Sequence, residues 1–280
     1  MLDRRTMIAA ALGAAAAGAW GMRAAGAAGA AGEGALSFVA DPELGLIPVC
    51  RGNLQVADAV GGNAANLVGE RADFDLMEKL GLLEGHLMIG KALLEAQMTN
   101  DAMPHFGHPV RELYAYIQPQ IERRGLAPFD GELAALETQA RSGAGGPFAQ
   151  MYAGAIHRLD ALRATVPAER MAQPDFMLGV ISQLVSDVAS DYGEAIERGR
   201  ISNTVEYHDA MGFLGYCERL TDRLQRGASG RAQQAYAATM RELQGAQRGF
   251  PALRPPTRPP LTVSAIRGHA ARIADLAKDA

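Results

Sequence analysis

Cysteine and aromatic residues are scarce in this 280-residue sequence, and several common catalytic motifs are missing from it. The chain has two cysteines, Cys50 and Cys217, and 6% aromatic residues. Neither cysteine belongs to a CxxC or CxxCH pattern, which excludes covalently attached c-type haem, although the two could pair in an oxidising compartment. The HExxH, GxSxG and P-loop patterns are also absent. Because the sequence pairs no nucleophile with a base, a non-enzymatic role is favoured, although an enzyme stays open as an alternative because helical bundles also host oxidases.

The beginning of the chain has the layout of an export leader. The paired arginines Arg4 and Arg5 precede an Ala- and Gly-rich apolar run at residues 7–21, and Arg23 and further small residues follow. The run is shorter than the roughly 20 residues that span a bilayer, so a membrane anchor is not favoured. We therefore predict a twin-arginine signal peptide at residues 1–31 and a soluble, periplasmic mature chain without a membrane span.

An excess of positive charge and alternating strand patterns are lacking as well. The leader holds three basic residues and one acidic residue, so the mature chain has 27 − 3 = 24 basic and 31 − 1 = 30 acidic residues, a net charge of −6. Because no basic patch stands out, nucleic acid is not an expected partner. Val, Ile and Thr never dominate an alternating run, whereas Ala, Leu, Glu, Gln and Arg dominate. This composition favours an all-α fold.

Apolar residues recur at helical spacing in several segments. Leu76, Leu80, Leu83 and Leu87 follow one another at intervals of 4, 3 and 4 residues, which places them on one face of a helix. Glycine- and proline-containing loops divide such segments. The predicted helices span residues 73–98, 104–124, 130–142, 147–164, 175–198, 204–226, 231–247 and 262–278, and residues 33–70 look irregular with room for one helix near 53–69.

These helices form two sets of four. Residues 94–116 can be aligned with residues 196–218 at an offset of 102, and in both segments a long helix ends in a short polar turn that starts the next helix. A set of four helices can bury its own core. We therefore predict two four-helix-bundle-like repeats packed together, with an irregular segment at 32–70, repeat 1 at 71–166 and repeat 2 at 167–280.

Histidines supply candidate metal ligands in the first repeat. His86 falls within a broad apolar arc of the first long helix, either as a core histidine bonded to a neighbour or as a metal ligand. His105, His108 and Glu112 are spaced by 3 and 4 residues and would share a face of a continuous helix, although two prolines interrupt the segment. They are either solvated or capping residues at a helix start, or ligands of a cation.

Methionines lie close to these histidines in the sequence. Met88, Met98 and Met103 offer thioethers that, together with His105 and His108, would suit copper. Methionine is also ordinary packing material in helical cores. Copper is therefore an alternative metal.

Carboxylates supply the candidate ligands in the second repeat. Asp187, Asp191 and Glu194 are spaced by 4 and 3 residues along the edge of an apolar stripe, where they repel one another unless a cation or basic side chains offset their charge. Oxygen ligands of this kind suit iron, manganese, magnesium or calcium, whereas pairing with arginines would make them a solvated acidic edge. Glu206 and Asp209 follow in the next helix, where Glu206 also fits a capping box behind Asn203.

The segment YGEAIERGRISNTVEYHD, which begins at Tyr192 and is followed by Phe213, resembles the extracytoplasmic helical region of bacterial high-affinity iron permeases. The similarity covers about 25 residues, and the transmembrane helices and the Arg-Glu-Gly-Leu-Glu motif of a permease are missing. The resemblance implies a free-standing soluble relative of that module that handles iron outside the cytoplasm, beside a permease, with carboxylates between residues 187 and 209 as ligands. The matching positions are Asp191, Tyr192, Gly199, Asn203, Glu206, Tyr207 and Phe213.

The leading hypothesis is a periplasmic metal-handling protein that holds iron between its helices and passes it to a membrane iron transporter. One alternative is a structural or partner-binding helical protein without a ligand, and another is a copper-binding protein. The predicted metal ligands are His86, His105, His108, Glu112, Asp187, Asp191, Glu194, Glu206 and Asp209.

Overall fold

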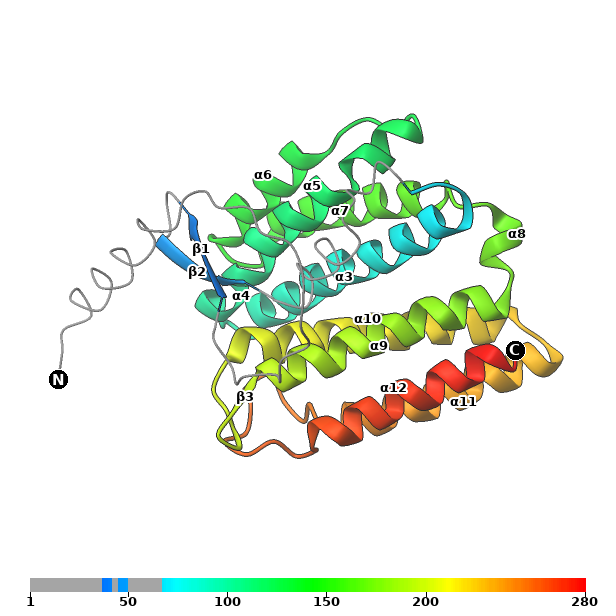
Figure 1. The fold of residues 1–280 in the computed structure, drawn as a ribbon. Helices are drawn as coiled ribbons and strands as arrows, with labels where there is room; N and C mark the ends of the chain where they lie inside the picture. Colours follow the sequence, from blue (N-terminus) through cyan, green and yellow to red (C-terminus); the bar gives the residue numbers. More distant parts are fainter. Residues whose placement is uncertain (1–36, 42–44, 50–66) are drawn as a thin grey trace, which may run out of the picture. The chain divides into compact units, whose positions relative to one another are not determined.

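Helices contain most of the described residues, which confirms the predicted all-α class (Figure 1). The computed structural model describes residues 37–41, 45–49 and 67–280, and all of these lie in one compact unit that spans residues 35–280. The predicted leader, Cys50 and most of the possible helix near 53–69 fall outside the described residues. The helices are α3 (Gly69–Glu95), α4 (Thr99–Phe106), α5 (His108–Arg123), α6 (Asp130–Ala140), α7 (Gly146–Arg163), α8 (Ala168–Met171), α9 (Pro174–Glu194), α10 (Thr204–Gly227), α11 (Gly230–Gln247) and α12 (Val263–Lys278).

The last four helices form an antiparallel bundle. Helix α9 packs against α10 and α12, and α11 packs against α10 and α12, so each helix contacts two others around a shared core. Consecutive helices reverse direction, and a proline-containing segment at residues 248–262 joins α11 to α12. This arrangement is that of a four-helix bundle.

Helix α3 connects this bundle to the helices that precede it. It contacts α4, α5 and α7 and also packs against α9 and α10, so it lies between the two groups of helices (Figure 1). The apolar residues predicted to share one face, including Leu76, Leu80, Leu83 and Leu87, are all fully buried. The described chain therefore has one continuous core, in which α3 packs against both groups. The prediction of two repeats remains a prediction.

The predicted helix at 104–124 is interrupted. It divides into α4 and α5 at Gly107, whose backbone angles of φ −89° and ψ −112° are not helical. Pro109 lies in the first turn of α5, where a backbone N–H would have no partner within the helix. A proline inside a continuous helix would remove a hydrogen bond, so the chain starts a new helix here. His105 and His108 consequently belong to different helices, so the single face proposed for His105, His108 and Glu112 does not exist.

The predicted helix at 175–198 also ends earlier than expected. Helix α9 stops at Glu194, and the strands β3 (Ile196–Glu197) and β4 (Arg200–Ile201) form a short antiparallel hairpin before α10. Arg198 and Gly199 have φ values of +51° and +74°, which a helix cannot accommodate. A second hairpin, β1 (Ser37–Asp41) with β2 (Gly45–Val49), lies in the segment that was predicted to be irregular.

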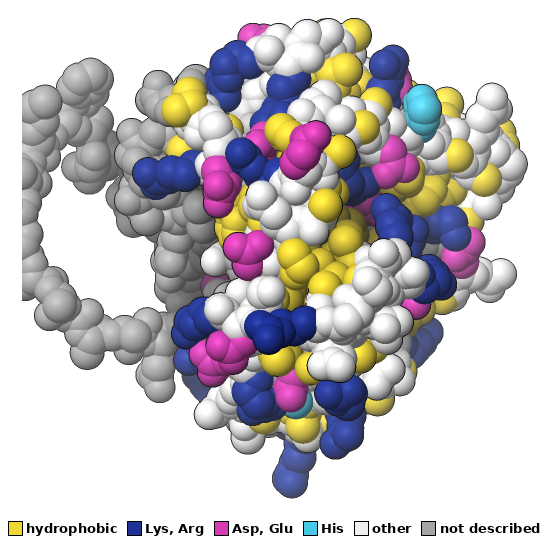
Figure 2. Space-filling view, turned by 90° about the vertical axis from the view of Figure 1, so that its right-hand side faces the viewer, with side chains coloured by type: hydrophobic (Ala, Val, Ile, Leu, Met, Phe, Trp, Pro, Cys, Tyr) yellow, Lys and Arg dark blue, Asp and Glu magenta, His cyan; other side chains and the backbone are white. Residues whose placement is uncertain are grey.

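Acidic residues on the surface have different neighbours from those in the interior. On the face shown in Figure 2, acidic and basic side chains are interspersed around exposed apolar side chains. In the interior, several carboxyl groups lie along α9 and α10, and none of the four is more than 8% exposed: Asp187, Asp191, Glu206 and Asp209. One of these buried groups, Asp209, belongs to the candidate site.

Candidate metal centre

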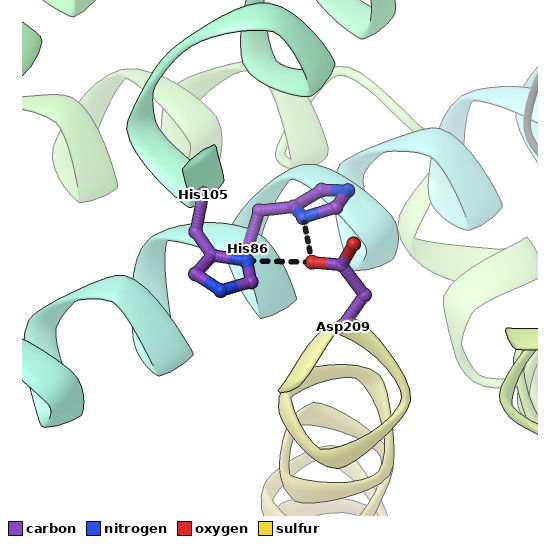
Figure 3. Close-up of side chains that lie close together, drawn as sticks. All are labelled: His86, His105 and Asp209. Atoms are coloured by element: carbon purple, nitrogen blue, oxygen red, sulfur yellow. Dashed lines mark hydrogen bonds and ion pairs between the residues drawn. The ribbon is translucent and has the colours of Figure 1, made fainter. Parts of the chain in front are cut away.

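Three polar side chains from three helices meet in the core of the protein. His86 comes from α3, His105 from α4 and Asp209 from α10, and all three side chains are fully buried (Figure 3). The Nδ1 atom of each histidine lies 2.7 Å from the same oxygen, Oδ1 of Asp209. One donor atom from each residue lies within 4.8 Å of the other two. Two imidazole nitrogens and a carboxylate oxygen are therefore already gathered at one point.

Two glycines allow α3 and α10 to approach closely beside this cluster. A Cβ atom on Gly212 would lie 2.5 Å from the backbone oxygen of Gly85, and one on Gly85 would lie 2.6 Å from the ring of Phe213. Gly85 precedes His86, and Gly212 follows Asp209 by about one helical turn. The absence of side chains at this crossing brings His86 within reach of Asp209.

Helix α4 packs against α3 through a similar contact between a glycine and an aromatic ring. The ring of Phe106 occupies the space next to Gly90, where a Cβ atom would lie 2.7 Å from the ring. The chain reverses at Gln97, whose φ of +61° lies in the left-handed region. These features direct His105, the residue before Phe106, towards α10.

Asp209 is a carboxylate in this environment. Burial by itself would raise its pKa, but the charges of His86 and His105 and their contacts with its oxygen outweigh burial and hold the pKa below its usual range. A carboxylate can only accept, so the hydrogen bond from His105 is donated by its Nδ1–H. The His86 contact has the same distance but not the direction of a hydrogen bond.

Hydrogen bonds within the protein do not account for all the ring nitrogens of the two histidines. In the described part of the chain, the Nε2 atoms of His86 and His105 have no hydrogen-bond partner. Buried polar atoms nearly always have partners in native proteins, and exceptions require an explanation. The rings of Phe213 and His86 pack nearly perpendicular to each other, and His208 lies beside His105 with ring centroids 5.6 Å apart. Apolar and aromatic groups thus exclude water from the cluster but leave the two Nε2 atoms without a hydrogen-bond partner in the described chain.

A row of carboxyl groups on α9 lies next to the cluster. Asp191 is 1% exposed, and neither of its oxygens has a hydrogen-bond partner in the described chain. Burial raises the pKa of Asp191, as do the negative charges of Glu206, Asp209 and two further acidic residues of α9. Burial also raises the pKa of Asp187 to about 7, with a contribution from Glu78 and an opposing one from Lys79.

The structure therefore joins some of the predicted ligands and separates others. It brings together His86, His105 and Asp209. The negative charges of three other predicted ligands raise the pKa of Asp191: Asp187, Glu194 and Glu206. Glu112 is a half-buried residue of α5 outside the three-residue group, and the side chain of His108 lies outside what the structure describes. The interpretation of His105 as a solvated or capping residue is wrong, because its side chain is completely buried.

The sequence did not indicate that Asp209 would contact both histidines. His105 was grouped with His108 and Glu112 by spacing along one helix, and Asp209 with the carboxylates of its own repeat. His105 and Asp209 are 104 residues apart in the sequence, so helical periodicity cannot detect their contact. The only local signals were the glycines beside His86 and Asp209, which mark a close helix crossing.

Residues 167–280 match the family model of the iron permease-associated 4-helix bundle domain. The match contains α9 to α12 and confirms the resemblance that residues 191–213 indicated. Asp209 and Asp191 lie within this iron permease-associated region, whereas His86 and His105 precede it. No curated protein and no solved structure matches the chain.

The match relates the last four helices to iron transport. Among the described helices, none is both long enough and apolar enough to cross a membrane. The iron permease-associated region thus contributes one of the three gathered donors, and the preceding helices contribute the two histidines. A site of this composition needs both groups of helices.

Proposed function

We propose that this protein binds iron, or a similar divalent cation, as cargo at His86, His105 and Asp209 and delivers it to a membrane iron transporter from the periplasmic side. The observation that carries the proposal is the convergence of two buried imidazole nitrogens on one carboxylate oxygen, at 2.7 Å each. The match of residues 167–280 to an iron permease-associated domain supports iron as the cargo and a permease as the partner. The export leader predicted at residues 1–31 supports the periplasm.

The donor set suits ferrous iron. Two imidazoles and one carboxylate are the ligand types that hold non-haem iron(II) with open positions. An ion with bonds of about 2.1 Å to each donor keeps the donors no more than about 4.2 Å apart, and they already lie within 4.8 Å. Small side-chain rotations would therefore complete the site. The cation would replace the proton at Nδ1, so each imidazole would carry its N–H on Nε2, and affinity should rise with pH.

The copper alternative has less support from the structure. The thioether residues Met88, Met98 and Met103 are partly buried and pack against the hydrophobic core. Packing therefore explains their presence. Titration of iron(II) and copper against the histidine variants separates the two metals.

The proposal is tested by anaerobic equilibrium dialysis with iron(II), followed by elemental analysis. We expect the wild type to retain the ion, and Asp209→Asn and His105→Gln to lose affinity by more than the 10–100-fold that is typical for groups that only orient ligands. His157→Gln is the matched control, because His157 is exposed on α7, and it should bind as the wild type does. Equal iron content in all four proteins would show that the cluster is a structural network only.

A further inference from the structure

Two connections of the four-helix bundle meet at one of its ends. The hairpin within residues 195–203 joins α9 to α10, and the proline-containing segment at residues 248–262 joins α11 to α12 (Figure 1). A hydrogen bond of 3.2 Å from the backbone N–H of Ile201 to the carbonyl oxygen of Thr257 links the two connections. They therefore form one continuous surface at this end of the bundle.

Arginines dominate this surface, which we call the arginine surface. The two connections contain five arginines and one acidic residue, Glu197, so they carry a net charge of +4 in a chain whose formal net charge is −4. Arg198 is 90% exposed and lies 3.7 Å from Glu197. Arg200, Arg254 and Arg258 are exposed as well, and none of the three forms an ion pair within the described residues. The surface thus presents guanidinium groups that no described carboxylate neutralises.

The backbone of the proline-containing segment is fixed by contacts with the bundle. The hydroxyl of Tyr207 donates a hydrogen bond of 2.8 Å to the carbonyl oxygen of Ala252. The hydroxyl of Tyr192 donates one of 3.0 Å to the carbonyl oxygen of Leu261. Five prolines in the segment also restrict its φ angles. Because the segment is already ordered, binding through its arginines costs little backbone entropy.

The arginine surface lies next to the candidate metal centre. The Nε2–H of His208 donates a hydrogen bond of 2.7 Å to the carbonyl oxygen of Leu253, and Arg254 is the next residue. On its other side, the ring of His208 lies beside the ring of His105, with centroids 5.6 Å apart. One side chain therefore separates the backbone of the arginine surface from a ligand of the proposed iron site.

We propose that the arginine surface binds the phosphate groups of an anionic lipid bilayer and so holds the metal centre close to the membrane. Guanidinium groups bind phosphate oxygens through paired hydrogen bonds, and clusters of four or more basic residues are typical of proteins that bind anionic bilayers. The arginines are spread over two connections at the end of a helical bundle, which suits a layer of headgroups better than a single acidic peptide. The remainder of the chain carries a net charge of −8, so repulsion would turn the arginine surface towards the bilayer.

The inference rests on the proposed function for its purpose, because a transporter that receives the ion lies in a bilayer. Cosedimentation with lipid vesicles tests it. The protein without residues 1–31 is used, because the apolar run of the predicted leader would itself enter lipid and lies outside the compact unit at 35–280. We expect binding to vesicles with about 30% phosphatidylglycerol, little binding to pure phosphatidylcholine, and loss of binding at about 0.5 M NaCl, which screens the attraction.

A pair of double variants shows whether the arginine surface makes this contact. Arg254→Gln/Arg258→Gln should bind the anionic vesicles roughly 30-fold more weakly, because each arginine near such a bilayer contributes about a factor of five. Arg223→Gln/Arg231→Gln is the matched control and should bind as the wild type does. It removes the same charge from exposed positions of α10 and α11 at the opposite end of the bundle. Both variants should retain iron(II) in dialysis.

The outcomes separate this inference from the proposed function. Absence of binding to anionic vesicles, equal binding by the two double variants, or binding that salt does not weaken would each overturn the inference, and normal retention of iron(II) would leave the proposed function intact. Binding to poly-L-glutamate without binding to anionic vesicles would also overturn it and would indicate an acidic protein segment as the partner. Vesicle binding by a wild type that retains no iron(II) would keep the arginine surface and overturn the proposed function.

Discussion

At the scale of single residues, the protein places acidic groups in the core under two opposite conditions. Asp209 faces two imidazoles, which favour its ionised form, while Asp187 and Asp191 face burial and other carboxyl groups, which disfavour theirs. The sequence predicted that these residues, with His86 and His105, were candidates for metal binding. It could not predict which of them would meet, because spacing defines a helix face and only tertiary packing brings faces together.

Asp187 should make the metal-free protein less stable as the pH rises. Its pKa is raised from 3.8 to about 7, so the folded state holds the proton more tightly than the unfolded state. The stabilisation is full below about pH 4 and is lost as the pH rises to about 7, whereas Asp209, with a lowered pKa, loses its contribution only at more acidic pH. Asp187→Asn should therefore raise the free energy of unfolding at pH 8 by on the order of 4 kcal/mol.

Urea unfolding at pH 5 and pH 8 in the presence of a chelator measures this effect. The wild type should lose more stability between the two pH values than Asp187→Asn. Asp222→Asn, on the same bundle but half exposed and paired with Arg226, should keep the wild-type slope. Identical pH dependence in wild type and Asp187→Asn would show that Asp187 is ionised without penalty.

At the scale of elements, helical periodicity predicted most of the helices. The bounds of α6, α7, α10, α11 and α12 agree with the predicted ranges to within two residues. The capping role of Asn203 is confirmed, because its side-chain oxygen accepts a hydrogen bond from the backbone N–H of Val205 at 3.2 Å. The misplaced ends, at Gly107 and at Arg198–Gly199, are positions where backbone conformation overrides an uninterrupted helical pattern of side chains.

The crossing of α3 and α10 should be sensitive to a single added methyl group. In Gly212→Ala the new Cβ would lie 2.5 Å from the backbone oxygen of Gly85, which cannot move without moving α3. We expect destabilisation of about 1–3 kcal/mol and weaker iron(II) binding, because Asp209 lies one turn earlier on α10. Thermal unfolding and dialysis measure the two effects.

Gly154→Ala is the matched control for this substitution. Gly154 is exposed on α7 with no atom within 4 Å of an added Cβ. Alanine is favoured over glycine inside a helix by roughly 0.5–1 kcal/mol, so this variant should be slightly more stable and bind iron(II) normally. If Gly212→Ala behaved in the same way, the close approach of the two helices would not position the site.

At the scale of the whole molecule, the candidate site combines two groups of helices with different relationships to known proteins. The last four helices match an iron permease-associated domain, while α3 and α4 supply both histidines from outside the matched region. The sequence indicated the first part through the residues around 191–213. It could not indicate the second, because the contacts of α3 with α9 and α10 join segments that are distant along the chain.

Cation binding between the two groups should stabilise the entire fold. An ion that binds only the folded state contributes about 2.7 kcal/mol when its free concentration is 100 times the Kd. For a chain of this size, that corresponds to a rise in Tm of about 5–10 °C. Scanning calorimetry with iron(II) should show the rise for the wild type and its reversal by a chelator, and Asp209→Asn should show neither. An equal Tm with and without the metal would favour a ligand-free structural protein.

The convergence of both histidines on one cation is tested most directly by anomalous diffraction at the iron absorption edge, from crystals loaded anaerobically with iron(II). We predict an anomalous peak within bonding distance of Nδ1 of His86, Nδ1 of His105 and a carboxylate oxygen of Asp209. A map with no peak there, in which both imidazoles still contact Asp209 directly, would contradict the proposed metal centre.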